Sequence, residues 1–365
     1  MGFKCGIVGL PNVGKSTLFN ALTQTAHAQA ANYPFCTIEP NIGEVAIPDP
    51  RLQALADIAK SEKVVPTRMT FVDIAGLVEG ASKGEGLGNQ FLGNIREMDA
   101  IAYVLRCFDD DDVAHVNNRV DPVSDSEIVE TELMMADIDS IERRLPAIDK
   151  KARSGDQQSR EILPILEDAY HLLQQGKPAR ILSLKDNEKT IFTSLQLLSA
   201  KPILYVCNVD EQSASTGNKH SETISKLADI ENAKTVVISA KIESELSQLE
   251  DNDRSEYLSG IGIVEPGLNR LIHSGYELLD LMTYFTAGPK ESRAWTIPNG
   301  STARRAAREI HTDFESGFIR AEVISYTEYV NLGGEQKSKD AGKMRVEGKD
   351  YIVKDGDVIY FRFNV

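Results

Sequence analysis

The residues with the clearest chemistry lie near the start of the chain, where residues 9–17 read Gly-Leu-Pro-Asn-Val-Gly-Lys-Ser-Thr. This run matches G-x-x-x-x-G-K-[ST], in which glycines let backbone N–H groups curl around a polyphosphate. Lys15 is expected to neutralise the β- and γ-phosphates, and Ser16 to bind Mg²⁺. The alternative is a glycine turn without a ligand. The pattern predicts a phosphate site formed by Asn12, Val13, Gly14, Lys15, Ser16 and Thr17.

An acidic and glycine-rich segment follows the apolar run 69–74. Asp73 at the end of this run is placed to hold Mg²⁺, and the N–H of Gly76 to meet a γ-phosphate. Thr37, in the polar segment before it, is placed to complete the Mg²⁺ coordination. Residues 76–93 contain six glycines, which allow large backbone changes. They predict a mobile switch that senses the γ-phosphate, or otherwise an ordinary long loop.

Two further polar segments follow apolar runs that read as core strands. Residues 207–211 are Cys-Asn-Val-Asp-Glu, and residues 239–241 are Ser-Ala-Lys. In sheets covered by helices, ligands bind at the carboxyl ends of the strands. We therefore expect a nucleotide base to lie against Asn208, Val209, Glu211, Ser239 and Ala240.

Short apolar runs alternate with helical spacing along most of the chain, which predicts an α/β fold with a mostly parallel sheet. Several runs are apolar on both faces, as strands between two helix layers are. The predicted strands are residues 3–9, 69–74, 101–108, 202–207 and 235–239, and the predicted helices are residues 15–25, 54–60, 88–98 and 267–282.

One connection, of about 95 residues between the runs 101–108 and 202–207, is far longer than the roughly 30 of a βαβ unit. Within it, apolar residues repeat at steps of four and three on two successive helices. They are Met134, Ile138, Ile141, Leu145 and Ile148, and then Ile162, Leu166, Ala169 and Leu173. Residues 125–196 are predicted to form an inserted helical hairpin, either a docking arm or a passive insertion.

This insertion would divide the nucleotide-binding domain into residues 1–124 and 197–281, and leave residues 282–365 as an α+β module. In that module a loop is expected at residues 283–289, and strands at residues 322–325, 351–353 and 358–363. A helix should begin after Ser301 or Thr302, either of which can cap it. Its spacing places Arg304, Arg308 and His311 on one face beside Arg305, for RNA phosphates or simply for solvent.

Composition describes an ordinary globular chain of 365 residues, with 41% hydrophobic residues and a formal net charge of −15. No apolar run approaches the ~18 residues of a membrane span, and no signal peptide is evident, so a soluble, cytoplasmic protein is expected. The four cysteines lack zinc-site spacing. Residues 1–282 carry 27 basic and 43 acidic side chains, whereas residues 283–365 carry 13 and 12. Nucleic-acid contact is therefore expected to be local, in the tail.

Together these motifs resemble the Obg-type family of translation-factor-class P-loop GTPases, and the whole chain is similar to the YchF family of Obg-like ATPases. Residues 283–365 are similar to a TGS domain, a β-grasp module. The resemblance implies a P-loop ATPase that binds ATP and ADP, works as a nucleotide switch and associates with the ribosome, on its large subunit, or with structured RNA. A monomer is expected. An RNA-binding factor with incidental turnover and a GTPase are the alternatives.

The chain departs from ordinary GTPases at two positions. Where these read guanine with N-K-x-D, residues 208–211 are Asn-Val-Asp-Glu, so the resemblance implies a preference for ATP over GTP, while the residues alone leave relaxed specificity open. Leu77 stands where many GTPases place a water-orienting Gln. His115 is similar in position to a histidine proposed for that role in the family, although a solvated loop histidine is equally consistent with the sequence. Asn12 resembles the asparagine of K⁺-stimulated GTPases, which suggests K⁺.

Overall fold

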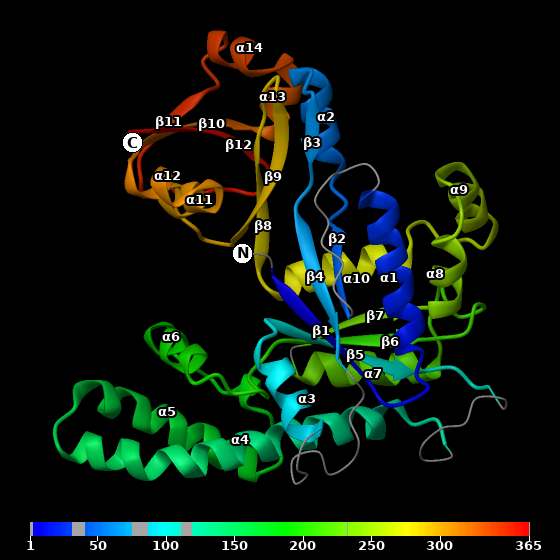
Figure 1. Cartoon of the computed structure of the whole chain (residues 1–365), viewed down its shortest axis with the longest axis vertical. Helices are drawn as coiled ribbons and strands as arrows, with labels where there is room; N and C mark the ends of the chain where they lie inside the picture. The colour runs from blue at the N-terminus through cyan, green and yellow to red at the C-terminus, as the bar shows by residue number, and fades with distance from the viewer. Residues whose placement is uncertain (1–2, 31–40, 75–86, 111–118, 232, 365) are drawn as a thin grey trace.

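The computed structural model describes residues 3–30, 41–74, 87–110, 119–231 and 233–364. Within these residues, the strands form two six-stranded sheets (Figure 1). The first sheet has the order β2-β4-β1-β5-β6-β7. All of its neighbouring strands run parallel except β2, which is antiparallel to β4. The predicted α/β class with a mostly parallel sheet is confirmed.

The strands of the first sheet follow the apolar runs closely. Every residue of the neighbouring strands β5 and β6 is buried, as expected for strands covered on both faces. The six strands are β1 (Lys4–Val8), β2 (Ile42–Ala46), β4 (Arg68–Asp73), β5 (Ala100–Arg106), β6 (Ile203–Asn208) and β7 (Lys234–Ile238).

Helices cover both faces of this sheet. On one face, α1 (Lys15–Ala30) and α10 (Gly267–Leu278) bury Leu22 and Leu271 against the strands. The other face packs against α3, α7, α8, α9 and the first turns of α4. These helices span Leu87–Arg96 (α3), Pro122–Arg153 (α4), Lys219–Glu231 (α7), Ala240–Leu246 (α8) and Asp251–Gly260 (α9).

The long connection between β5 and β6 holds α4, α5 (Gln157–Gln174), a short 3-10 turn (Ala179–Ile181) and α6 (Asp186–Ser194). The helices α4 and α5 run side by side away from the first sheet, and the turn between them lies at the far end (Figure 1). Their contact is the predicted apolar seam, with Ile141, Leu166, Ala169 and Leu173 buried in one cluster.

A buried polar network fixes this insertion to the first sheet. Arg180 donates to Glu130 of α4 at 2.8 Å and to Glu231 of α7 at 2.9 Å. Tyr103 of β5 and Tyr205 of β6 donate their hydroxyls to the same two carboxylates. Because burial penalises the charged form, the pKa of Glu130 is raised. The insertion is therefore anchored rigidly at its base.

The second sheet has the order β11-β10-β12-β8-β9-β3. Five of its strands come from the C-terminal part of the chain, and the sixth, β3 (Lys63–Val65), comes from the N-terminal part and pairs with β9. The C-terminal strands are β8 (Leu281–Thr286), β9 (Glu291–Pro298), β10 (Phe318–Ser325), β11 (Arg345–Glu347) and β12 (Asp357–Phe363). The helices are α11 (Ala303–Ile310), α12 (Thr312–Ser316), α13 (Tyr326–Leu332) and α14 (Glu335–Asp340).

Three local predictions for this module are wrong. The expected loop at residues 283–289 is largely β8, because its Thr-Tyr-Phe-Thr run pairs with β9 despite the Gly-Pro that follows. The expected strand at 351–353 makes only an isolated bridge, between Ile352 and Thr302. His311 lies beyond α11, since its ring accepts the N–H of Asp313 and caps α12 instead. The cap of α11 is Thr302, one of the two residues predicted.

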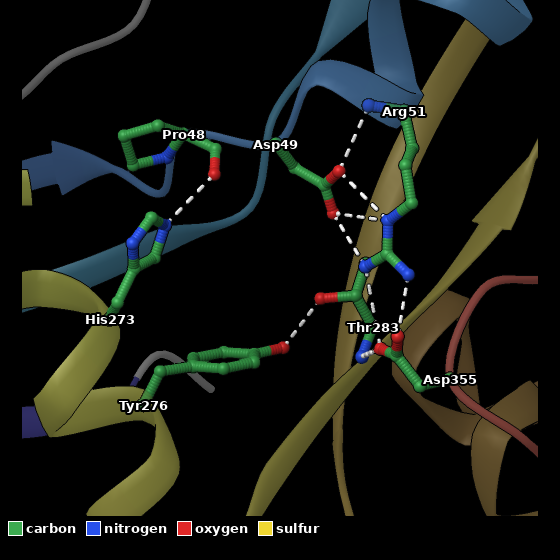
Figure 2. Close-up of polar contacts among 7 residues, drawn as sticks. All are labelled: Pro48, Asp49, Arg51, His273, Tyr276, Thr283 and Asp355. Carbon is green, nitrogen blue, oxygen red and sulfur yellow. Dashed lines mark hydrogen bonds and ion pairs between the residues drawn. The ribbon is translucent and has the colours of Figure 1, made fainter. Parts of the chain in front are cut away.

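The two sheets are joined through α2 (Pro50–Ala59), which buries Leu52 and Leu55 in the core of the second sheet. Arg51 binds Asp49 at 2.8 Å and Asp355 at 2.5 Å, and Asp355 also accepts the N–H of Thr283 at 3.0 Å (Figure 2). From α10, the hydroxyl of Tyr276 lies 2.7 Å from that of Thr283 (Figure 2). The C-terminal module is thus built onto the segment that follows β2.

Candidate functional site

The loop after β1 has the backbone that its glycines predict. Asn12 and Gly14 both have positive φ angles, 63° and 90°, and α1 begins directly afterwards at Lys15. A Cβ at Gly9 would lie 2.7 Å from the carbonyl oxygen of Val104, and one at Gly14 would fall on the side-chain amide of Asn208. Only glycine fits at these two positions, so the curl of the loop is dictated by local sequence and close packing together.

Asn208 connects this loop to the next one along the sheet edge. Its side chain is 5% exposed at the end of β6. The amide nitrogen donates to the carbonyl of Val13 at 2.9 Å, and the amide oxygen accepts the N–H of Ala240 at 2.9 Å. Both polar groups of the Asn208 side chain therefore hold two loops together. Asn208 thus positions the phosphate loop relative to the loop that follows β7.

Lys15 and Asp73 face each other across the base of the site. Their side chains form an ion pair and are 11% and 16% exposed. Ser16 and Thr17 are exposed in the first turn of α1, where the helix N-terminus favours an anion. The structure brings the predicted phosphate-binding lysine beside the predicted metal-binding carboxylate.

These loops line a cavity of about 910 Å³ at the carboxyl ends of β1, β5, β6 and β7. Its residues include most of the predicted phosphate- and base-binding positions. The lining consists of Gly9, Leu10, Pro11, Asn12, Gly14, Lys15, Ser16, Thr17, Phe108, Asp109, Asp110, Asn208, Val209, Asp210, Glu211, Ser239, Ala240, Lys241, Ser244 and Glu245. The cavity is large enough for a nucleotide.

The predicted base-reading residues differ in which of their hydrogen-bonding groups are already engaged within the protein. Val209 is 2% exposed, and its N–H is committed to the carbonyl of Ile238 at 2.9 Å. Glu211 is ion-paired with Lys241, and this hydrogen bond lowers the pKa of the Glu211 carboxyl. The Glu211 carboxylate is thus already engaged at the mouth of the cavity. Ser239 and Ala240 also line the cavity.

Sequence reasoning missed part of the loop that follows β5. Phe108 lines the cavity, and the buried guanidinium of Arg106 lies 4.8 Å from the centre of its ring. Arg106 also donates to the carbonyl of Asp110 at 2.9 Å. Arg106 thereby holds the start of the loop that leads toward His115. This loop could have been predicted to line the site from its position, because it follows the carboxyl end of a central strand of the sheet.

Three predicted site residues, Thr37, Gly76 and His115, lie outside the described residues, as do Leu77 and most of the glycine-rich segment. Within the described residues there is no group of three or more His, Cys, Asp or Glu side chains that could hold a metal. Ser16 and Asp73 nevertheless supply a hydroxyl and a carboxylate beside the cavity. Such oxygen donors fit Mg²⁺, which typically takes one or two protein carboxylates and completes its shell with water and phosphate oxygens.

A strand–loop–helix with G-x-x-x-x-G-K-S, a parallel sheet and a ligand-sized cavity at its carboxyl edge define the class: a P-loop nucleoside triphosphatase. No helix among the described residues is both long and apolar enough to cross a membrane. Two family models match parts of the chain. Residues 4–138 match the model described as "50S ribosome-binding GTPase", and residues 281–364 match the YchF-GTPase_C model, described as "Protein of unknown function (DUF933)".

Full-length relatives narrow the class to one family. The chain is 56% identical to "Ribosome-binding ATPase YchF" of Haemophilus ducreyi and 50% identical to the protein of the same name from Bacillus subtilis, with 100% of both chains covered in each case. A solved structure, "Structure of the Schizosaccharomyces pombe YchF GTPase", matches with a TM-score of 0.88 at 36% identity, covering 99% of this chain and 98% of that one. The chain belongs to the YchF family, as the motifs predicted.

Proposed function

We propose that this protein is a Mg²⁺-dependent ATPase that prefers ATP to GTP and associates with the ribosome in a nucleotide-controlled manner. Membership of the YchF family supports ATP hydrolysis and ribosome association, because bacterial relatives carry the name "Ribosome-binding ATPase". A protein with this partner acts in the cytoplasm, and we propose that it does so as a monomer.

The observation that carries the nucleotide preference is the state of Glu211. Guanine recognition in N-K-x-D proteins needs a carboxylate that accepts two hydrogen bonds from the base. Here the carboxylate is one methylene longer and is paired with Lys241, and Val209 replaces the lysine that would pack on the base. A base that needs this carboxylate must first break that ion pair, whereas adenine makes no such demand.

The phosphates would be held by the loop of residues 9–17 and the start of α1. Ser16 and Asp73 would hold Mg²⁺, which supplies charge stabilisation to the phosphate oxygens when it is bound. Lys15 would leave Asp73 to neutralise the β- and γ-phosphates, while backbone N–H groups of the loop stabilise the charge that develops as water attacks.

Most of the remaining roles are proposed for residues outside the described part of the chain, and one is proposed for Asn12 in the phosphate loop. Thr37 would complete the metal coordination, the N–H of Gly76 would meet the γ-phosphate, and His115 would orient the attacking water because Leu77 cannot. Asn12 would help to place a K⁺ ion. His115→Ala should lower ATP turnover without weakening nucleotide binding, and K⁺ should stimulate turnover more than Na⁺ does.

Competition between unlabelled ATP and GTP for one fluorescent nucleotide site tests the proposal most directly. We expect ATP to displace the probe at lower concentration than GTP, and chelation of Mg²⁺ to abolish turnover. Equal displacement would support the second candidate, a nucleoside triphosphatase of relaxed specificity, which is favoured by the similarity to the fission-yeast protein, described as a GTPase.

A third reading, a ribosome-binding factor with incidental turnover, makes a different prediction for Lys15→Ala. If nucleotide occupancy controls association, this variant should lose the difference in ribosome affinity between ATP and ADP. Unchanged ribosome binding that never depended on nucleotide would support the third reading.

A further inference from the structure

In the described part of the chain, the cations on α11 and those at the turn between α4 and α5 differ in how they are already paired. On α11, Arg305 lies 3.4 Å from Glu309, and Arg308 lies 3.6 Å from Glu315. Arg304 donates to the carbonyl of Glu315 at 3.2 Å. Two of the three arginines on this face are therefore paired with carboxylates, whereas Arg304, among the described residues, bonds only a backbone carbonyl.

The second cluster lies at the turn between α4 and α5. Residues 149–160 contain four basic and two acidic side chains, whereas residues 122–148 of α4 contain two basic and seven acidic ones. With 32 residues, α4 is about 48 Å long, and the turn lies at the end remote from the first sheet (Figure 1). A local positive surface thus lies at the far end of an otherwise acidic arm.

The carboxylates at this turn are occupied. Asp149 accepts the Nε–H of Arg153 at 2.8 Å, and Asp156 caps α5 by accepting the N–H of Ser159 at 2.8 Å. The hydrogen bonds to Ser159 lower the pKa of the Asp156 carboxyl, and the charge of Lys151 adds to this effect. The arm tip, defined as residues 149–160, has its acidic groups committed to the turn itself.

Three cations of the arm tip remain available. Lys150, Lys151 and Arg160 are exposed, and across the described part of the chain none of them has a carboxylate within ion-pair distance. Arg160 donates its Nε–H to the carbonyl of Ala152 at 3.1 Å, which neutralises no charge and holds the guanidinium over the turn. Lys150 and Lys151 lie in the last turn of α4, where the helix C-terminus favours cations, and both side chains remain exposed to solvent.

We propose that the arm tip is the surface through which this protein contacts the phosphate backbone of ribosomal RNA, with Lys150 and Lys151 as the principal contacts. Unpaired cations on a projecting, rigidly anchored arm reach a polyanion without bringing the acidic body of the protein against it. Counterion release upon phosphate contact then supplies affinity. This inference rests on the proposed ribosome association and assigns it to α4–α5 instead of α11.

The test uses the full chain with two glutamines, Lys150→Gln/Lys151→Gln, in co-sedimentation with purified bacterial 70S ribosomes and with deproteinised ribosomal RNA. The matched control is Lys185→Gln/Lys189→Gln, which removes the same charge from the same insertion at lysines already paired with Glu188 and Asp186. A second comparison is Arg304→Gln/Arg308→Gln on α11. Thermal unfolding and ATP turnover in the absence of ribosomes are measured for every variant.

We expect the arm-tip variant to bind both ribosomes and RNA on the order of tenfold more weakly at 0.1 M salt, with a salt dependence shallower by roughly 1.5 in log K against log[salt]. The control should bind like wild type, and ATP turnover should be unchanged in both. Wild-type affinity in the arm-tip variant, or a loss confined to the α11 variant, would overturn the inference while leaving the proposed function intact. If the arm-tip variant binds ribosomes more weakly but the wild-type protein does not bind the deproteinised RNA, the arm tip contacts a ribosomal protein. That result would also overturn the inference. A wild-type protein that binds no ribosomes in any nucleotide state would instead refute the proposed function.

Discussion

Replacing Asn208 by alanine removes both hydrogen bonds that join the phosphate loop to the loop after β7. The carbonyl of Val13 and the N–H of Ala240 then lose their partners in a buried setting. Each buried group that loses its only partner costs about 1–3 kcal/mol, so the total penalty for the two groups is roughly 2–6 kcal/mol. Water entering the cavity would reduce it toward the lower end.

Part of this penalty should appear in nucleotide binding, because a bound nucleotide must order both loops. A share of about 1.4 kcal/mol is tenfold in affinity, so we expect fluorescent ATP to bind Asn208→Ala at least roughly tenfold more weakly than wild type. Asn208→Asp is the informative partner variant. It retains the acceptor for Ala240 but places an oxygen against the Val13 carbonyl, so it should lose affinity to a similar degree.

The assay is titration of fluorescent ATP into each variant, with urea unfolding to measure stability separately. Folded Asn208→Ala that binds ATP within twofold of wild type would refute the reasoning, because the two loops would then be ordered without this side chain. Asn208→Asp with wild-type affinity would show that the bond to Val13 is dispensable.

Three further outcomes are expected elsewhere in the molecule. Arg51→Ala should lower the free energy of unfolding by about 1–3 kcal/mol, because it breaks charged hydrogen bonds to Asp49 and Asp355. Lys189→Ala, which breaks one exposed ion pair, should leave the free energy of unfolding nearly unchanged, and equal effects of the two variants in urea melts would contradict this. Residues 282–365 expressed alone lack α2 and β3 and should show no cooperative thermal transition by circular dichroism, and a sharp transition would show that the shared core is unnecessary. The hydrogen bonds from Arg362 and Arg320 lower the pKa of Glu322 in the folded state, so its contribution to stability is present above the ordinary glutamate pKa of about 4.5 and is lost as pH falls through the lower folded value. The stability difference between wild type and Glu322→Gln should therefore shrink below pH 4.5, and a constant difference would argue against the assignment.

Local patterns were sufficient for the phosphate loop and for most elements of the first sheet. Residues 9–17 are contiguous, and their curl depends on glycines at fixed positions. The strands β5 and β6 are continuous apolar runs, and the seam of α4 repeats at helical spacing. The prediction of a loop at 283–289 was wrong, because a Gly-Pro pair indicates a turn but does not determine where the preceding strand ends.

What the sequence by itself determined is the chemistry of the site and the class of the fold, since both are carried by residues close together in the chain. Only the tertiary structure decided that Asn208 holds Val13 in place, that Arg51 meets a carboxylate 304 residues away, and that β3 completes the second sheet. Hydrophobic period shows which face of an element is buried but not which element covers it. Hydrogen bonds and ion pairs between groups distant in sequence form only when the chain has folded into its tertiary structure. In this protein such pairs shape the cavity, anchor the arm and join the two sheets.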